Sequence, residues 1–409
     1  MKYMMKVFVV TNTFPPEVWG GATHTYEVAY YLHKLGVNVE VLAPYPKYPY
    51  GEFKRQWRPV HREIINEVRV TRLLSPQPHS PNPSFIARFL EYTGFPLHAA
   101  IRLSFSLVFK KKDNVIIFTS QPPDTVIVTG YLLKRVLGIK WVIDVRDLWQ
   151  ENAAALGLTS RKSVFFRLLS AVKKRAYQRV DLIAYTAETI KNRLQRDYNI
   201  NGKLIFNPNG LDPDIFYPRD VKRGKNLVYL GNVGHAYELE TVIKAFHYID
   251  DPEVNLLIRG GGDRKPELQQ FVNEHNLNGR VKFLPKLSRE KLQRLLSSCL
   301  MGICPLKSVE SLRSVIPIKV LEYMGAGIPF IACGQGEIET LAEESGAGII
   351  VENDPTAFAQ AINKLVGNHK LREEMGGEGR EYVVRKFNKP KIIADLYKEL
   401  IAIEDGERK

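Results

Sequence analysis

The sequence predicts an α/β protein in which two successive parallel-sheet domains are each covered by helices. Short β-branched apolar runs alternate along nearly the whole chain with segments of helical periodicity, which is the pattern of repeated strand–helix units. The series restarts after a polar, proline-containing stretch, residues 208–225, and this restart indicates a second domain. A length of 409 residues with 44% hydrophobic residues fits two or three globular domains and excludes a disordered or fibrous chain.

The predicted strands fall into two sets. The first set comprises residues 6–11, 37–43, 115–120, 141–145, 181–186 and 203–207. The second set comprises residues 226–231, 254–260, 280–285, 300–305, 329–333 and 347–351. Ligands of doubly wound sheets bind beyond the carboxyl ends of the strands. We therefore expect two Rossmann-like, doubly wound domains, residues 1–207 and 208–387, that face each other across a cleft.

The charge of the chain is concentrated in its first half. Residues 1–210 hold 30 basic and 15 acidic side chains, whereas residues 211–409 hold 28 and 29. This asymmetry suggests an anionic partner of the first domain, which could be a membrane surface, a nucleic acid or a phosphorylated substrate. The alternative is that these lysines and arginines are simply solvated.

The three cysteines, Cys299, Cys304 and Cys333, form no CxxC pair, so neither a disulfide framework nor a zinc site is expected. A reducing cytosol fits this usage best. No uncharged apolar run reaches the roughly 18 residues that are needed to span a bilayer.

Two motifs follow strands of the first domain. Gly20 and Gly21 precede a helical pattern, where backbone N–H groups can approach a phosphate; a plain Gly-Gly turn is the alternative. Asp144, Arg146 and Asp147 crowd the end of the strand at residues 141–145, with Glu151 close behind. Carboxylates placed there can orient hydroxyl groups, and Arg can bind phosphate or carboxylate. The alternative is a cluster of surface charges.

A third motif lies in residues 305–330. Pro317 stands at an expected helix start, and Lys319 and Glu322 follow three residues apart on one helical face. The N–H groups of a first turn can receive a phosphate, and Lys319 would add positive charge. A carboxylate one turn later can accept hydrogen bonds from a ribose diol. A surface Lys–Glu pair is the alternative reading.

Taken in order, the GG pair, DVRDLW, NPNGLD, YLGN, RGGGD and PIKVLEYMGAGIP resemble the motifs of the family 4 glycosyltransferases over essentially the whole chain. These are retaining, metal-independent enzymes of the GT-B fold. Within the family, the sequence is most similar to enzymes that build polysaccharides on lipid-linked precursors. The resemblance implies a hexosyltransferase that needs no cofactor or metal. Its substrates would be a UDP- or GDP-linked sugar and a glycan or lipid-linked acceptor.

The resemblance also implies a role for each matching residue. Glu322 would bind the ribose, Lys319 the diphosphate, and Asp147 the acceptor, with Arg146 near the reacting sugar. The other expected donor-binding residues are Gly20, Gly21, Asn209, Gly231, Asn232, Phe283, Leu284, Ser314, Ile316, Pro317 and Ile318. The first domain would bind the acceptor and the second the nucleotide sugar.

Three positions depart from the family pattern. Ser314 stands where many members have a sugar-contacting Glu, and Glu310 is the nearest acidic residue. Arg146 replaces a His. The usual basic pair after the first strand of the second domain is absent from GNVGHAYELE, so His235 is the local candidate and Lys319 would carry more of the charge neutralisation.

Residues 85–112 and 161–180 combine apolar and aromatic residues with basic ones, which is typical of helices that lie in a membrane interface. Ordinary core-packing helices are the alternative. We expect a cytoplasmic enzyme, peripheral on the inner face of the membrane. Residues 388–409 would cross back to the first domain, as the resemblance implies, or form a helix on the second.

Other classes of protein explain less of the sequence. No nucleic-acid recognition module accompanies the basic charge, so no nucleic-acid partner is expected, although a basic nucleic-acid-binding protein remains an alternative. IRGGGD has the wrong glycine spacing for a nicotinamide-binding fingerprint. A nucleotide-sugar epimerase of the same fold is a further alternative.

Overall fold

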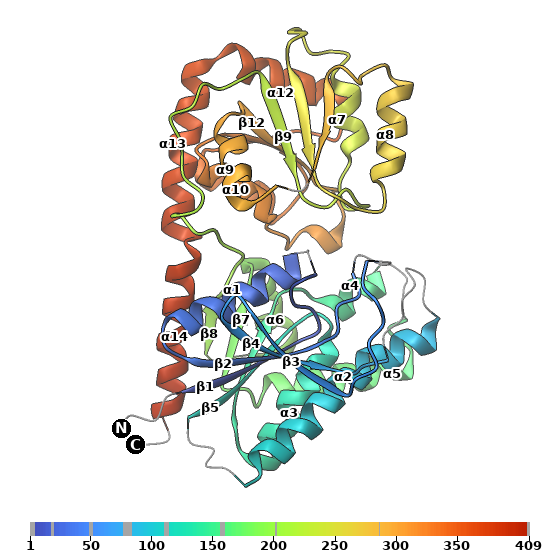
Figure 1. Cartoon of the computed structure of the whole chain (residues 1–409), viewed down its shortest axis with the longest axis vertical. Helices are drawn as coiled ribbons and strands as arrows, with labels where there is room; N and C mark the ends of the chain where they lie inside the picture. The colour runs from blue at the N-terminus through green and yellow to red at the C-terminus, as the bar shows by residue number, and fades with distance from the viewer. Residues whose placement is uncertain are drawn as a thin grey trace. The chain divides into compact units, whose positions relative to one another are not determined.

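The computed structural model describes residues 5–17, 20–48, 52–76, 84–109, 114–155, 160–200, 203–285 and 287–406. The chain divides into two compact units (Figure 1). Unit 1 consists of residues 1–208 together with 390–409, and unit 2 consists of residues 209–389.

Unit 1 is built on a sheet that has eight strands among the described residues, in the order β3-β4-β2-β1-β5-β6-β7-β8. All neighbours are parallel except β3 and β4. Its strands are β1 (Lys6–Thr11), β2 (Asn38–Pro44), β3 (Val60–Ile65), β4 (Val68–Leu73), β5 (Val115–Ser120), β6 (Lys140–Val145), β7 (Leu182–Tyr185) and β8 (Leu204–Phe206). Its helices are α1 (Gly20–Lys34), α2 (Phe85–Leu107), the 3-10 turn η1 (Asp124–Val126), α3 (Ile127–Leu137), α4 (Trp149–Ala155), α5 (Val164–Tyr177), α6 (Glu188–Tyr198) and α14 (Lys389–Asp405).

Helices cover both faces of this sheet. On one face, α1 and α14 bury residues such as Leu32, Ile393 and Leu396 against β1 and β2. On the other face, α2, α3, α5 and α6 pack on β5 and β6, with Trp141 fully buried at the centre. The C-terminal helix α14 therefore belongs to the core of unit 1.

Unit 2 contains a parallel sheet of six strands within the described residues, in the order β11-β10-β9-β12-β13-β14. Its strands are β9 (Asn226–Leu230), β10 (Asn255–Arg259), β11 (Val281–Leu284), β12 (Met301–Pro305), β13 (Phe330–Cys333) and β14 (Gly348–Ile350). Its helices are α7 (Leu239–Ala245), α8 (Lys265–Glu274), α9 (Arg289–Ser297), the 3-10 turn η2 (Glu310–Leu312), α10 (Ile318–Gly325), α11 (Glu337–Ser345), α12 (Pro355–Gly367) and α13 (His369–Lys386).

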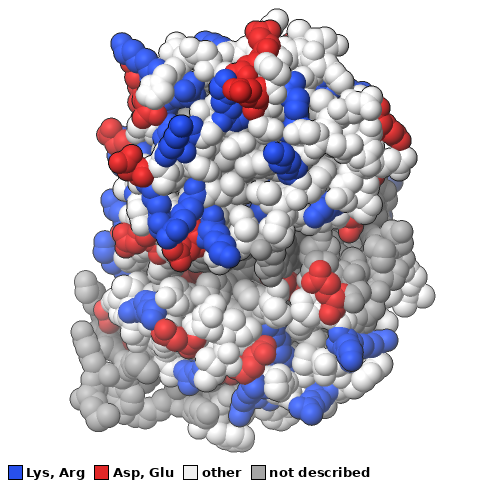
Figure 2. All heavy atoms as spheres, turned by 45° about the horizontal axis from the view of Figure 1, so that its top comes forward, with Lys and Arg blue, Asp and Glu red and all other residues white. Residues whose placement is uncertain are grey.

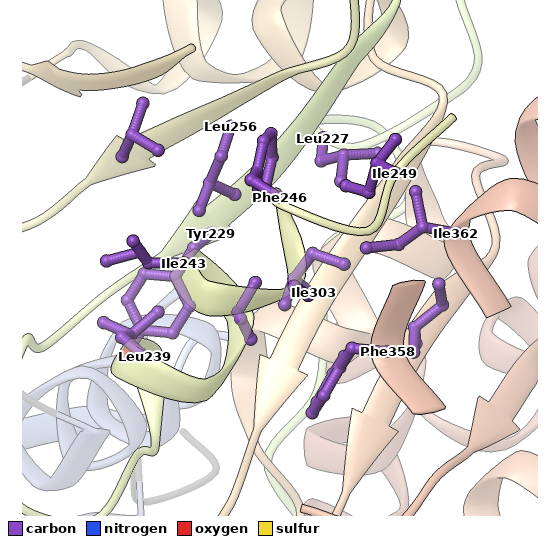
Figure 3. Packing of buried hydrophobic residues seen from close by; sticks show 14 of the residues in the cluster. Leu227, Tyr229, Leu239, Ile243, Phe246, Ile249, Leu256, Ile303, Phe358 and Ile362 are labelled. Atoms are coloured by element: carbon purple, nitrogen blue, oxygen red, sulfur yellow. The ribbon is translucent and has the colours of Figure 1, made fainter. Parts of the chain in front are cut away.

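The main core of unit 2 lies between the sheet and α7, α8 and α12. Figure 3 shows Tyr229 of β9 packed beside Leu239 and Ile243 of α7, with Phe358 of α12 in the same cluster. On the opposite face, Tyr323 of α10 lies against β12. This packing fixes where β9, β10 and β12 end, and the helices α7, α8 and α10 begin near that edge (Figure 1).

Every strand that the sequence predicts is present, within one or two residues, but the antiparallel pair β3–β4 was missed. Both central residues of its turn, Asn66 and Glu67, have positive φ values, 44° and 72°. Such a turn usually carries Asn-Gly, and the absence of glycine here removed the strongest hairpin signal. Gly20 and Gly21, expected before a helix, form the first two residues of α1.

Some predictions fall where the structure gives no description. Residues 77–83 of the predicted loop and Lys110, Lys111 and Lys112 of the basic segment lie outside the described residues. On the face drawn in Figure 2, acidic and basic side chains are interspersed. No helix in the described part of the chain is long and apolar enough to cross a membrane.

Candidate functional site

The carboxyl ends of β9 and β10 bring two glycines into contact. Gly231, directly after β9, has a φ of +103°, a conformation that favours glycine. Gly260 directly follows β10, and a Cβ atom on it would lie 1.8 Å from the carbonyl oxygen of Gly231. No side chain other than hydrogen fits there. Both glycines are half-buried and bring backbone, without side chains, to the edge where ligands of such sheets bind.

Helix α10 begins at the same end of the sheet. Pro317 precedes its first residue, and its fixed φ suits the start of a helix, where the N–H groups lack intrahelical partners. Asn209 lies beside this start, since its Nδ2 donates to the carbonyl oxygen of Ile316 at 3.1 Å. The Oδ1 atom of Asn209 is buried and has no hydrogen-bond partner among the described residues.

Lys319 is the most unusual side chain of this region. It is only 6% exposed, and its Nζ has no hydrogen-bond partner in the described part of the chain. The side chain lies against Gly231: a Cβ atom on that glycine would be 3.7 Å from Nζ. Burial lowers the pKa of Lys319 to about 7, although Glu322 acts in the opposite direction. A buried amine without a partner is costly to fold and is suited to receive an anion.

The remaining residues predicted for this site are distributed along the edge. Glu322 is half-buried on α10, one turn after Lys319. Phe283 and Leu284 are half-buried at the end of β11, two strands away from β9. Asn232 is exposed, and Ser314 is half-buried just before α10.

The two residues considered as substitutes lie at the surface. Glu310 is exposed and lies 3.4 Å from Arg313. His235 is exposed in the segment between β9 and α7.

In unit 1, Asp144 is the centre of a buried polar cluster. Its Oδ2 accepts a hydrogen bond from Ser120 Oγ at 2.7 Å and lies 3.2 Å from His24 Nε2, while Asn207 Nδ2 donates to Oδ1 at 3.0 Å. Burial would raise the pKa of Asp144, but His24, Arg146 and the hydrogen bond from Ser120 outweigh it and hold the pKa below its usual value. Asp144 therefore links α1, β5, β6 and the segment after β8, and its role is structural.

Arg146 and Asp147 follow β6 at the carboxyl edge of the unit 1 sheet, as predicted from their position after a strand. Both are half-buried, and the Nε of Arg146 has no hydrogen-bond partner among the described residues. Asn152 Nδ2 donates to Asp147 Oδ1 at 2.6 Å. Burial, reinforced by the negative charge of Asp124, raises the pKa of Asp147 to about 6. At neutral pH most Asp147 side chains are ionised and can accept a hydrogen bond from a hydroxyl group.

An ion cluster that the sequence did not predict lies next to Asp147. Lys173 is fully buried, and its Nζ donates to Asp124 Oδ2 at 2.6 Å and to both carboxylate oxygens of Glu151 at 3.0 Å. Burial would lower the pKa of Lys173, but these carboxylates raise it well above the usual value.

Lys173, one of the basic residues of the segment 161–180 that was predicted to lie in a membrane interface, is thus buried within the core of unit 1. A signal was present in the spacing. Lys173 stands four residues from both Leu169 and Tyr177, on the buried stripe of α5. The described residues contain no group of three or more His, Cys, Asp or Glu side chains placed to hold a metal ion.

Two protein-family models match this chain. The model described as "Glycosyl transferase 4-like domain" matches residues 20–210, and the model described as "Glycosyl transferases group 1" matches residues 216–382. The chain belongs to the family 4-like glycosyltransferases. The fold of both units, each with a parallel sheet between helices, is the GT-B fold.

Other proteins, both relatives in sequence and solved structures of the same fold, match this glycosyltransferase over nearly its whole length. It is 24% identical over 419 residues to the putative colanic acid biosynthesis glycosyl transferase WcaI of Escherichia coli, covering 97% of this chain and 100% of that one. The sucrose-phosphate synthase of Thermosynechococcus elongatus has the same fold, with a TM-score of 0.73, 20% identity and coverage of 97% and 99%. Anabaena HepE in complex with UDP and glucose has a TM-score of 0.70 at 14% identity, with coverage of 97% and 99%.

Proposed function

We propose that unit 2 of this glycosyltransferase binds a nucleoside-diphosphate sugar, with Lys319 as the cation that meets the diphosphate. The observation that carries this proposal is the buried Nζ of Lys319 beside Gly231, which has no hydrogen-bond partner among the residues that the structure describes. A diphosphate would supply the missing hydrogen-bond acceptors and the counter-charge. The start of α10 and the backbone at Gly231 would add N–H donors for the same oxygens.

The other contacts follow from the geometry of α10. Glu322, one turn after Lys319, would accept hydrogen bonds from the ribose diol. Asn209 and the backbone of residues 315–318 would line the phosphate end. Asn209 donates to Ile316, and its Oδ1 has no hydrogen-bond partner within the described residues. Phe283 and Leu284, at the end of β11, would flank the base. A UDP- or GDP-linked sugar fits this arrangement, and HepE is a neighbour in fold whose complexes contain UDP.

The mechanism we propose is metal-independent and retains the anomeric configuration. Lys319 and the N–H groups at the start of α10 would neutralise the leaving diphosphate. The acceptor hydroxyl would attack the anomeric carbon from the side of the phosphate, and the diphosphate would take its proton as the glycosidic bond forms. Asp147, ionised at neutral pH, would orient that hydroxyl, and Arg146 would act on the reacting sugar. The acceptor would be a glycan or lipid-linked precursor of a polysaccharide, since one relative is named as a putative colanic acid biosynthesis glycosyl transferase.

The proposed contact between Glu322 and the ribose can be tested by substitution. Replacing Glu322 with alanine should weaken the binding of UDP or GDP by about 10- to 100-fold, because a hydrogen bond to a charged group contributes about 1.5–3 kcal/mol. Calorimetry in EDTA buffer measures this directly. Glu343→Ala, at an exposed position on α11 of the same unit, is the control and should bind as the wild type does. Binding of NAD or of an oligonucleotide alone, with neither nucleoside diphosphate, would contradict the proposed function.

We also propose that unit 1 docks on an anionic membrane through α2 and α5. Helix α2 is apolar on two opposite faces. Phe95, Ala99 and Leu103 lie in the core, whereas a second stripe faces outward. The outward stripe consists of Ile86, Leu90, Leu97, Ile101, Phe105 and Val108, all exposed. A helix with apolar residues on two opposite faces normally has partners on both sides.

Basic residues at the start of the neighbouring helix α5 favour a lipid partner. Phe89 of α2 contacts Phe165 of α5, with 5.5 Å between the ring centroids, so the two helices are neighbours. Arg161, Lys162 and Arg167 are exposed at the start of α5. An apolar stripe beside basic side chains suits the headgroup region of an anionic bilayer. This attachment would place the enzyme peripherally on the cytoplasmic face of the membrane, close to a lipid-linked acceptor.

Vesicle binding tests the docking surface. The wild type should bind vesicles of anionic phospholipid and bind less as salt is added. Phe105→Glu, at a residue that is 78% exposed, should weaken binding at least about tenfold, because burial of such a side chain contributes about 1.5–3 kcal/mol. Tyr248→Glu, at an exposed aromatic residue of unit 2, is the control. If the wild type did not bind at low salt, or if both variants bound equally, the docking proposal would fail.

A further inference from the structure

The ammonium group of Lys319 lies between two tyrosine rings. Its Nζ is 3.9 Å from the ring centroid of Tyr229 and 3.4 Å from that of Tyr237. The two rings meet edge to face, with 5.6 Å between centroids and 76° between planes. Together they form an aromatic box around a cation that makes no hydrogen bond within the described residues.

Both rings are held by contacts that do not involve Lys319. Tyr229 is fully buried in the core of unit 2 (Figure 3), and its hydroxyl donates to the carbonyl oxygen of Asn232 at 2.6 Å. Tyr237 sits in a segment tied to the end of β12: it forms a β-bridge with Leu306, and Glu238 N donates to the carbonyl oxygen of Pro305 at 2.8 Å. The positions of both rings are therefore set by the fold of unit 2.

A ring face stabilises a cation without occupying its N–H groups. The quadrupole of the ring attracts the charge, and the effect is largest where water is excluded, as around Lys319. A carboxylate in the same place would consume the N–H donors and repel a diphosphate. The rings thus favour the charged form of the amine and leave its donors available on the side of Gly231.

We infer that Tyr229 and Tyr237 are positioning residues that hold the charged Lys319 ammonium toward the diphosphate of the donor. The inference rests on the proposed function and deepens it. Tyr237 lies in the segment GNVGHAYELE, which contains no lysine or arginine, so Lys319 has no basic neighbour from this segment.

Two substitutions at Tyr237 distinguish the effect of the aromatic ring from the effect of the hydroxyl group. Tyr237→Phe keeps a ring face and should bind UDP or GDP within about twofold of the wild type. Tyr237→Leu removes the ring and should weaken binding of the same nucleoside diphosphate about tenfold or more, as expected for a desolvated cation–π contact. Binding of the nucleoside without phosphates should not change in either variant. Thermal unfolding of each variant shows whether it is folded, and Tyr237→Met replaces Tyr237→Leu if the latter is not.

A double-mutant cycle with Lys319→Met tests whether the ring of Tyr237 acts through the amine. If the ring had only a structural role, its removal would weaken diphosphate binding equally with and without Lys319. If the ring acts through the amine, Tyr237→Leu should have no further effect on diphosphate binding once Lys319 is methionine. Equal binding by the Leu and Phe variants, or losses that multiply in the double mutant, would overturn the aromatic box. If the wild type itself bound neither UDP nor GDP, the proposed function would fail first.

Discussion

Replacing Lys319 with methionine should lower turnover by about a hundredfold or more. Methionine keeps the length and apolar stem of the side chain but removes the charge that would meet the leaving diphosphate. Loss of one preorganised electrostatic contact of this kind typically costs about 10²–10³ in rate. The measurement is the initial rate of sugar transfer from a labelled nucleotide sugar in buffer with EDTA. A rate that disappears on chelation in the wild type would contradict the metal-independent scheme.

The stability of the same variant distinguishes lost chemistry from lost folding. Folding lowers the pKa of Lys319 from 10.5 to about 7, so the cost of burying this amine is absent at high pH and grows as the pH falls toward 7. Lys319→Met should therefore be at least as stable as the wild type at pH 7, with a difference that shrinks toward pH 10. Lys364→Met, at an exposed position of α12, is the control for turnover and should not alter it. Unchanged turnover in Lys319→Met would remove the role proposed for this lysine.

Replacing Lys173 with methionine should lower the free energy of unfolding by about 3–5 kcal/mol, which is the usual cost of removing one partner from a buried ion pair. Asp124 is almost fully buried and would lose its counter-ion at 2.6 Å, and Glu151 would lose the same partner. Denaturation by urea measures the change. The pH dependence of activity should change as well, because the negative charge of Asp124 contributes to the raised pKa of Asp147.

The neighbouring residue offers a matched control. Lys174 is the next residue of α5 and is exposed. Lys174→Met should change the free energy of unfolding by no more than about 0.5 kcal/mol, as surface substitutions usually do. Equal effects at the two positions would show that the buried cluster does not contribute to stability in the way the structure implies.

The strands and their helices could be predicted because their signal is local. Runs such as VIIFTS at residues 115–120 are buried on both faces, so β-branched apolar residues occur without interruption. The hairpin of β3 and β4 could not be predicted in this way, since charged residues occupy its outer positions and its turn lacks glycine. The place of Lys319 one residue after the start of α10 was likewise predictable, because Pro317 marks that start in the sequence.

Local sequence patterns predicted the order of all strands except β3 and β4, the family, and which residues stand at the carboxyl ends of the predicted strands. The surroundings of each charge became known from the three-dimensional structure alone. Lys173 and Lys174 are adjacent and identical in type, yet one is buried between two carboxylates and the other is solvated. Lys319 lies between the rings of Tyr229 and Tyr237, which are 90 and 82 residues away in the chain. Burial and the choice of partner depend on contacts between distant segments, and local periodicity does not encode them.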